Sequence, residues 1–172
     1  MDMQGEGRIG TVEMRTDLSA TGRQFLSFML GDESYGVDIL RVQEIKGYTA
    51  VTHIPNTPAF IKGVLNLRGT IVPIIDLRTK FGMPSAEPTP FTVIVVVVVR
   101  DKVMGLVVDS VSDVLDIDPK EVQPAPQFGG NVDTSFLQSM AKVGDRLVAM
   151  LDIDRVLADQ DVAQAAAVVG GN

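Results

Sequence analysis

Asn66 to Gly82 read NLRGTIVPIIDLRTKFG, and this stretch decides the fold that we expect for the chain. It contains an Arg-Gly turn at Arg68 and Gly69, a strand from Ile71 and a second basic turn. Glycine allows the positive φ that such a turn requires, and Arg68 then projects outward. Because the stretch contains no catalytic side chain, it indicates recognition rather than chemistry.

The region around this stretch occurs twice in the chain. Residues 25–36 align without a gap with residues 94–105, so Gly36 matches Gly105, 69 positions later. Each copy has a strand, a polar turn and a second strand, which is the pattern of a β-hairpin. Residues 71–77 match residues 147–153, 76 positions later, so the second copy has gained seven residues in a loop rich in proline and glycine.

Each copy also predicts a short helix before its last hairpin. Thr57 is placed as the N-cap and Pro58 as the first helical residue in one copy, and Asp133, Phe136 and Leu137 mark the other. With about five short strands, each half is typical of a small SH3-like barrel. A half of roughly 65 residues is marginally stable alone, so we expect the two barrels to share a core. Whether they exchange a terminal strand is left open.

The fold class expected is therefore mainly β, with two five-stranded barrels related by internal duplication, short helices and a C-terminal helix. We place the first barrel at about 23–84 and the second at about 90–153, within one domain spanning 23–157. Residues 1–22 read as a disordered tail and not as a signal peptide or membrane anchor. The alanine-rich segment 154–172 predicts a helix, capped by Asp152 or Asp154, that frays past Ala165.

The composition excludes several function classes. The chain has no cysteine, which fits a reducing compartment and removes thiol catalysis and thiolate metal sites. Its 15 basic and 22 acidic residues give a net charge of -7, so binding to nucleic acid is not expected. The most apolar segment, 91–99, is too short to span a bilayer as a helix. A mean hydropathy of +0.21 indicates some apolar surface reserved for partners.

No catalytic, metal or cofactor site is predicted. The only histidine, His53, lacks the partner ligands of a metal site and reads as a structural residue at a strand end. Two carboxylate pairs, Asp109 with Asp113 and Asp116 with Asp118, could in principle serve acid–base chemistry. Their setting at strand ends and turns favours a structural role instead. We therefore expect no enzyme activity and no cofactor.

Arg68 and Glu44 are the candidate binding residues. Arg68 is either a solubilising turn cation or an interface residue, since arginine is enriched at interface hot spots. Strand alternation places Val42 and Glu44 on one face. A Glu44–Arg68 pair flanked by Val42 and Ile71 would form a groove with both apolar and charged walls.

Phe128 is a further candidate, because it stands in the inserted loop and has no counterpart in the first copy. It either folds back onto the barrel or projects as an anchor for a partner, and the neighbouring prolines would stiffen such an anchor.

At these residues the chain resembles the CheW family of bacterial chemotaxis coupling proteins. The resemblance runs from Gln24 to Leu157 and rests on FLSFMLGDESYGVDILRVQEI, NTPAFIKGVLNLRGTIVPIIDLRTKFG, GLVVDSVSDVL and QPAPQF. The motif NLRGTIVPIIDLR is a specific signature after a hairpin of this kind. The chain departs slightly from the family pattern in having ESYG where an EYG-like turn is usual.

The resemblance implies two intertwined SH3-like barrels in a non-catalytic cytoplasmic adaptor, monomeric when free. Its implied partners are chemoreceptor signalling tips and the regulatory domain of the histidine kinase CheA, and it would be recruited to membrane-associated receptor arrays. The implied receptor and kinase groove includes Val42, Glu44, Arg68 and Ile71, together with Gly105 and Val111 of the second copy. The loop carrying Phe128 would contact the kinase or the array.

Two alternatives remain at this point. The chain could be a coupling domain detached from a larger kinase or receiver-bearing scaffold; the lack of a phosphotransfer or receiver segment favours a separate adaptor. It could also be a small β-barrel enzyme or ligand binder that uses acidic side chains.

Overall fold

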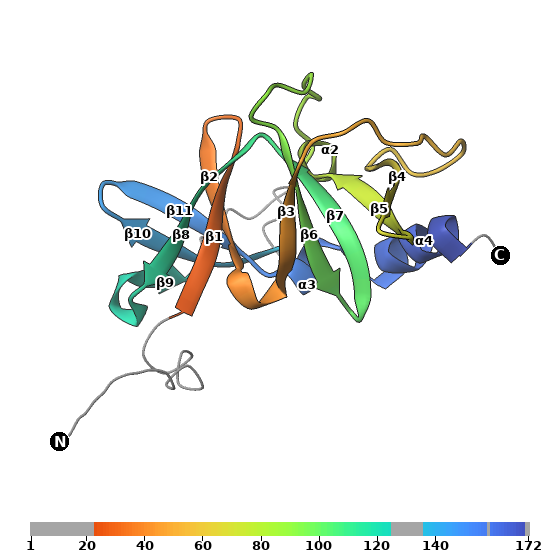
Figure 1. Cartoon of the computed structure of the whole chain (residues 1–172). Coiled ribbons are helices and arrows are strands. Elements are labelled where there is room, and N and C mark those ends of the chain that lie inside the picture. Colours follow the sequence, from red (N-terminus) through yellow and green to blue (C-terminus); the bar gives the residue numbers. More distant parts are fainter. Residues whose placement is uncertain (1–22, 125–135, 158, 171–172) are drawn as a thin grey trace.

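The computed structural model describes residues 23–124, 136–157 and 159–170, and these form two sheets that lie side by side (Figure 1). The predicted tail 1–22 and Phe128 lie outside the described residues. The six-stranded sheet has the order β8 (Ser110–Ile117), β1 (Arg23–Leu30), β2 (Glu33–Asp38), β11 (Arg146–Leu151), β10 (Leu137–Val143) and β9 (Val122–Pro124). The five-stranded sheet has the order β3 (Val42–Gly47), β6 (Val93–Val99), β7 (Lys102–Val108), β5 (Thr70–Asp76) and β4 (Ile61–Leu67).

The two halves of the sequence exchange their first hairpins. The hairpin β1–β2 joins the strands of the second half, where β2 pairs in parallel with β11. The hairpin β6–β7 joins the strands of the first half, where β7 pairs in parallel with β5. The five-stranded sheet is therefore continuous in sequence, over residues 42–108, and this differs from the boundaries expected at 23–84 and 90–153. The sequence left open whether a single terminal strand is exchanged. In the structure each half gives a two-stranded hairpin to the sheet of the other half.

A shared core holds the two sheets together. The largest hydrophobic cluster takes residues from both sheets and from the C-terminal helices, and it separates two smaller clusters, one within each sheet. A row of four aromatic rings crosses it, in the order Phe28, Tyr35, Phe81 and Phe136. The centroids of successive rings are 5.9, 5.7 and 4.5 Å apart. Burial of one large apolar side chain contributes about 1.5–3 kcal/mol, so a cluster common to both sheets strongly favours their association.

Strand β6 reads VIVVVVV because both of its faces are buried. Val95, Val97 and Val99 face the shared core, whereas Ile94 and Val96 face the cluster within the five-stranded sheet. A half-buried strand would alternate apolar and polar residues, and a strand covered on both sides reads as a continuous apolar run. The apolar run therefore indicates a strand that lies between two hydrophobic clusters.

The duplication predicted from sequence is present in the hydrogen bonding. The N–H of Asp76 donates to the carbonyl of Phe60 at 2.8 Å, and the N–H of Asp152 donates to that of Phe136 at 2.9 Å. Both donors and both acceptors are 76 positions apart. Asp76 then caps α2 (Leu77–Lys80) by accepting from the N–H of Arg78, and Asp152 caps α3 (Ile153–Val156) in the same way.

Two local expectations differ from the structure. The segment after Thr57 forms a turn and not a helix, because the Thr57 hydroxyl donates to the carbonyl of Ile54 and the N–H of Ile61 bonds to Pro58 at 3.0 Å. At the C-terminus the expected single helix is divided at Leu157 into α3 and α4 (Asp159–Gly170). Leu157 is fully buried in the shared core, and α4 continues to Gly170 rather than ending near Ala165.

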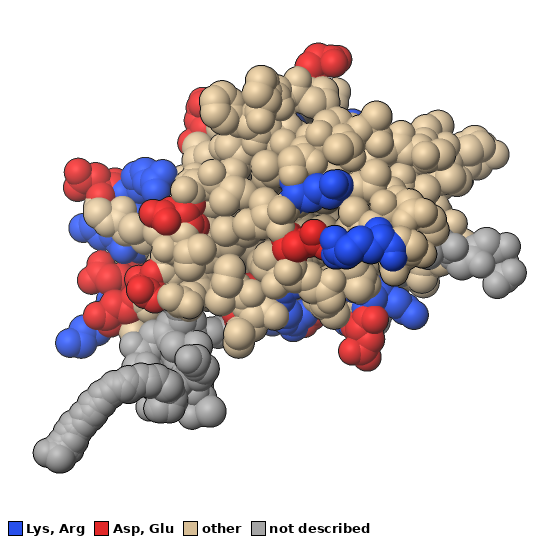
Figure 2. Space-filling model, in the orientation of Figure 1, with Lys and Arg blue, Asp and Glu red and all other residues tan. Residues whose placement is uncertain are grey.

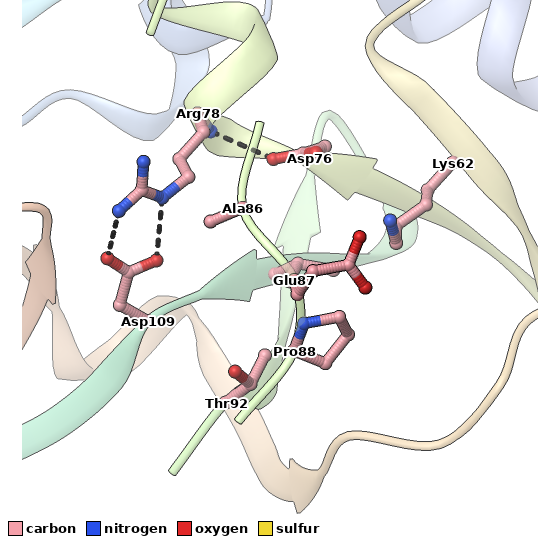
Figure 3. Close-up of a pocket in the computed structure, with 9 residues that line it drawn as sticks. Lys62, Asp76, Arg78, Ala86, Glu87, Pro88, Thr92 and Asp109 are labelled. Carbon is pink, nitrogen blue, oxygen red and sulfur yellow. Dashed lines mark hydrogen bonds and ion pairs between the residues drawn. The ribbon is translucent and has the colours of Figure 1, made fainter. Parts of the chain in front are cut away.

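An ion pair joins the two sheets beside a small pocket (Figure 3). The guanidinium of Arg78, on α2, donates through Nε and Nη2 to the carboxylate of Asp109 at 2.9 and 2.6 Å. The same carboxylate accepts from the N–H of Gly31, in the β1–β2 turn of the other sheet, at 2.8 Å. The hydrogen bonds from Arg78 and then from Gly31 hold the pKa of Asp109 below its usual value, although burial opposes them.

We predict that Gly105→Val destabilises the protein without changing its surface. A Cβ at Gly105 would lie 2.7 Å from Ile74 Cδ1 and 2.8 Å from Ile94 Cγ2, so the larger side chain must displace the core of the five-stranded sheet. The free energy of unfolding in urea should fall by about 1–3 kcal/mol. Gly47→Ala is the control, because the added methyl meets no atom within 4 Å. Equal stability of the two variants would contradict the packing argument.

We also predict a pH-dependent contribution from Asp109. Since the folded state depresses the pKa of this carboxyl, its stabilising effect is complete above the pKa of the unfolded chain and disappears as the pH falls below about 4. Asp109→Asn should lower the free energy of unfolding at pH 7 by about 1–3 kcal/mol. The difference between wild type and variant should shrink as the solution is acidified.

The matched control is Asp113→Asn, whose exposed carboxylate accepts from the N–H of Val114 on the same strand. Urea unfolding at several pH values measures all three proteins. A difference between wild type and Asp109→Asn that stays constant down to pH values below the folded pKa would rule out the proposed titration.

Candidate functional site

The turn between β4 and β5 presents Arg68 to solvent. Arg68 and Gly69 both have positive φ, of 51° and 89°, which is the backbone of a tight hairpin turn whose twist matches the strands. The side chain of Asn66 accepts from the N–H of Gly69 at 2.8 Å and fixes the turn. The Arg68 side chain is 74% exposed.

Glu44 comes from β3, the edge strand next to β6. The pairing of β3 with β6 shifts between Val42 and Glu44, where a bulge interrupts the regular register. Arg68 reaches Glu44 with both terminal nitrogens: Nη1 lies 3.4 Å from Oε1, and Nη2 bonds to Oε2. The hydrogen bond from Arg68 lowers the pKa of Glu44, so both groups are charged at neutral pH.

The pair lies at a groove of about 220 Å³ on the five-stranded sheet. Apart from Glu44 and Arg68, the groove is lined by Gln43, Leu67, Thr70, Val72, Val96 and Val103. Figure 2 shows an acidic and a basic group side by side over β3, β6 and β7, with a further basic group near them and uncharged surface around them, while charges of both signs are denser over β8 to β10. An ion pair at the rim of an apolar groove suits protein recognition, in which charge sets the partner and apolar contact supplies affinity.

The structure brings together only part of the predicted groove. Glu44 and Arg68 line it. Val42 is partly buried against the shared core, Ile71 is 39% exposed on β5, and neither lines the groove. Gly105 is buried inside the five-stranded sheet, so a partner cannot contact it directly.

Val111 lies in the other sheet. It is on β8, opposite Phe28, and packs against the shared core. The groove residues that the sequence did not indicate, such as Val96 and Val103, come from β6 and β7. The pairing of Glu44 with Val96 depends on the exchange of hairpins, and no local pattern in the sequence reveals it.

Other candidate sites carry little support. The pocket in Figure 3 is lined by charged side chains, and two of them, Arg78 and Asp109, already bind each other. Three of the four carboxylates considered for acid–base chemistry accept structural hydrogen bonds. Asp109 accepts from Arg78, Asp113 from the N–H of Val114, and Asp118 from that of Lys120. His53 is exposed. In the part of the chain that the structure describes, no cluster of three or more His, Cys, Asp or Glu could hold a metal ion.

No helix among the described residues is both long enough and apolar enough to cross a bilayer. Large apolar side chains are nevertheless exposed at several places on the surface. They are Leu40, Ile45, Ile71, Phe91, Val114, Val122 and Leu147.

Comparison with known proteins agrees with the resemblance noted in the sequence. The model of the CheW-like domain matches residues 24–161. The chain is 48% identical over 142 residues to the chemotaxis protein CheW of Klebsiella aerogenes, covering 83% of this chain and 86% of that protein. It is 37% identical over 144 residues to the CheW of Rhizobium meliloti, covering 84% and 93%.

A solved structure supports the same assignment. The scaffolding protein TtCheW of Thermoanaerobacter tengcongensis superposes with a TM-score of 0.74 at 33% identity, covering 81% of this chain and 95% of that one. The predicted mainly β, SH3-like architecture is thereby confirmed. The chain belongs to the CheW-like family and is a non-catalytic adaptor of chemotaxis.

Proposed function

We propose that this adaptor couples chemoreceptors to the histidine kinase CheA, in the cytoplasm and at membrane-associated receptor arrays. The observation that carries the proposal is the Glu44–Arg68 groove, a preformed recognition surface in a chain of the CheW-like family. The receptor signalling tip and the regulatory domain of CheA are the partners. The mechanism is scaffolding: two partners bound to one rigid body influence each other through linked binding.

The groove would recognise its partner by combining charge with apolar burial. In the free protein Arg68 is held by Glu44 at the open end of the groove, and this fixes its direction without a partner. A partner that covers Leu67, Val72 and Val103 removes water from around the ion pair, which strengthens its interactions with polar groups of the partner. Arg68 then acts as the charged anchor at the edge of the groove.

The remaining predicted residues have different parts in this proposal. Val42 and Ile71 flank the groove strands and would extend its apolar rim. Gly105 acts indirectly, because its missing side chain allows Ile74 and Ile94 to pack beneath the groove. Val111, on the other sheet, would belong to a second contact surface.

We predict that Arg68→Asp weakens retention by a receptor cytoplasmic fragment or by CheA more than about tenfold, since it places two carboxylates together at the groove. Lys120→Asp is the matched control, as the same reversal of charge on an exposed lysine outside the groove. Retention is measured by pull-down and titration, and thermal unfolding confirms the fold.

The double variant Glu44→Arg with Arg68→Glu restores an ion pair with opposite polarity. If the partner requires the positive charge at position 68 and the negative charge at position 44, this variant also binds weakly. Full retention of Arg68→Asp by both partner fragments would reject the groove as the binding site.

Phe128 remains a proposed contact to the kinase or the array. Phe128→Ala should reduce binding to the CheA regulatory domain or the clustering of receptors by about tenfold or more, if the ring is an interface anchor. Phe91→Ala is the matched control, since Phe91 is a phenylalanine just before β6 that is 72% exposed. Unchanged binding and clustering in Phe128→Ala would exclude this role.

A further inference from the structure

A second ion pair joins the two sheets. Its aspartate, Asp154, is 76 positions after Arg78, and its arginine, Arg41, stands one residue after Leu40, the position equivalent to Asp109. Asp154, on α3, is bound by Arg41 at the end of the short 3-10 helix Ile39–Arg41. Nη1 of Arg41 lies 3.0 Å from Oδ1 and Nη2 lies 2.7 Å from Oδ2, so the guanidinium and the carboxylate form a two-bond pair. Arg41 also donates to the carbonyl of Val98, in β6, at 3.2 Å.

The two ion pairs lie at corresponding places in the duplication, but their charges are opposite and one partner is shifted by a residue. Asp109 corresponds to Leu40, 69 positions earlier, and Arg41 corresponds to Ser110. Arg78 and Asp154 are each the second residue of the helix that follows a capping aspartate, 76 positions apart. Their partners Asp109 and Arg41 stand where the chain passes from one hairpin strand into the next strand, before β8 and β3 respectively. We call the first pair the Arg78 clamp and the second the Arg41 clamp.

The hairpin turns complete each clamp. In the Arg78 clamp the N–H of Gly31 donates to the carboxylate. In the Arg41 clamp the equivalent residue, Arg100, 69 positions after Gly31, donates to the carbonyls of Asp154 and Leu157 at 2.6 and 3.4 Å. Each clamp therefore connects a helix, an inter-strand junction and the turn of an exchanged hairpin.

The position of the Arg41 clamp links it to the groove. Arg41 stands where the chain crosses from β2, in the six-stranded sheet, to β3, in the five-stranded sheet. Asp154 follows β11 of the six-stranded sheet directly, through the cap at Asp152. Three residues after Arg41, the same edge strand presents Glu44. A bidentate guanidinium–carboxylate pair fixes orientation as well as distance.

We propose that the Arg41 clamp is a positioning device, which holds the start of β3, and with it the groove, at a fixed angle to the six-stranded sheet. Both side chains are more than a third exposed, at 38% and 36%, so the pair adds little to global stability. Its role is geometric. The effect on geometry is independent of the partners, whereas the effect on binding rests on the proposed function.

The first test measures the geometry in the free protein. Since the chain has no cysteine, spin labels can be attached to cysteines introduced at Ser112 in β8 and Lys102 in β7, which are exposed residues of different sheets. Pulsed electron resonance should give one narrow distance distribution for the wild type. Arg41→Gln should broaden it about twofold or more, because the shared core keeps the sheets together while the two-bond pair fixes their relative angle.

A rescue variant separates the clamp from a general loss of packing. The quadruple change Leu40→Asp, Arg41→Ser, Asp154→Arg and Arg100→Gly reproduces the residues of the Arg78 clamp at the equivalent positions. Gly suits the positive φ of 52° at position 100. This variant should restore the narrow distribution. Arg155→Gln is the control, because it removes the contact of 3.4 Å between Arg155 and Asp152 inside α3 and should leave the distribution unchanged.

The outcomes are distinct. A distribution in Arg41→Gln as narrow as in the wild type overturns the proposal, and so does a quadruple variant that folds and stays broad. If Arg41→Gln folds poorly by circular dichroism, Arg41→Lys keeps the charge and loses the two-bond geometry, and it must still broaden the distribution.

Binding to a receptor or CheA fragment provides the second test. Arg41→Gln should lower the affinity roughly two- to tenfold although the groove residues are intact. Broadened distances with unchanged affinity would reject the link to the groove. If the wild type binds neither fragment, the proposed function fails while the distance measurement still decides the role of the clamp.

Discussion

The reciprocal exchange of hairpins is the constraint on which the rest of this structure depends. Neither half closes its own sheet, because β1–β2 pairs with strands of the second half and β6–β7 with strands of the first. The strands of these hairpins then lie between a core inside their sheet and the core common to both. Separating the sheets would expose Phe28 and the inward-facing valines of β6, and this is why a small duplicated chain behaves as one body.

The candidate site follows from this exchange. Glu44 is on an edge strand of the first half, Arg68 is on a turn of the same half, and the floor between them includes Val96 and Val103 of the second half. The polar groups therefore come from one copy of the repeat and part of the apolar floor from the other. A binding surface made in this way depends on correct pairing of the hairpins, and so the surface and the fold cannot vary independently.

Local features of the sequence predicted a large part of this architecture. The hairpins, the duplication, the seven-residue gain and the cap at Asp152 are visible because turns, alternation and capping act over a few residues. The Glu44–Arg68 pair was also inferred, from a positive-φ turn and strand alternation. The order of the strands was not predicted, because a hairpin can pair equally well with the strands of its own half or with the equivalent strands of the other half. The turn after Thr57 was misjudged as a helix, since the Thr57 hydroxyl bonds backward to Ile54 and caps no helix after it.

Divergence between the copies gives the two sheets different surfaces. The position equivalent to Glu44 holds Asp113, which retains the acid, but the position equivalent to Arg68 holds Gly144. The second copy therefore keeps the hairpin turn, with a φ of 61° at Gly144, and lacks the guanidinium. The exposed aliphatic residue is kept in both copies, as Ile45 and Val114. Since strand geometry and apolar contact are shared while the charge pair is not, electrostatics is the property that lets a partner distinguish the two otherwise equivalent edges.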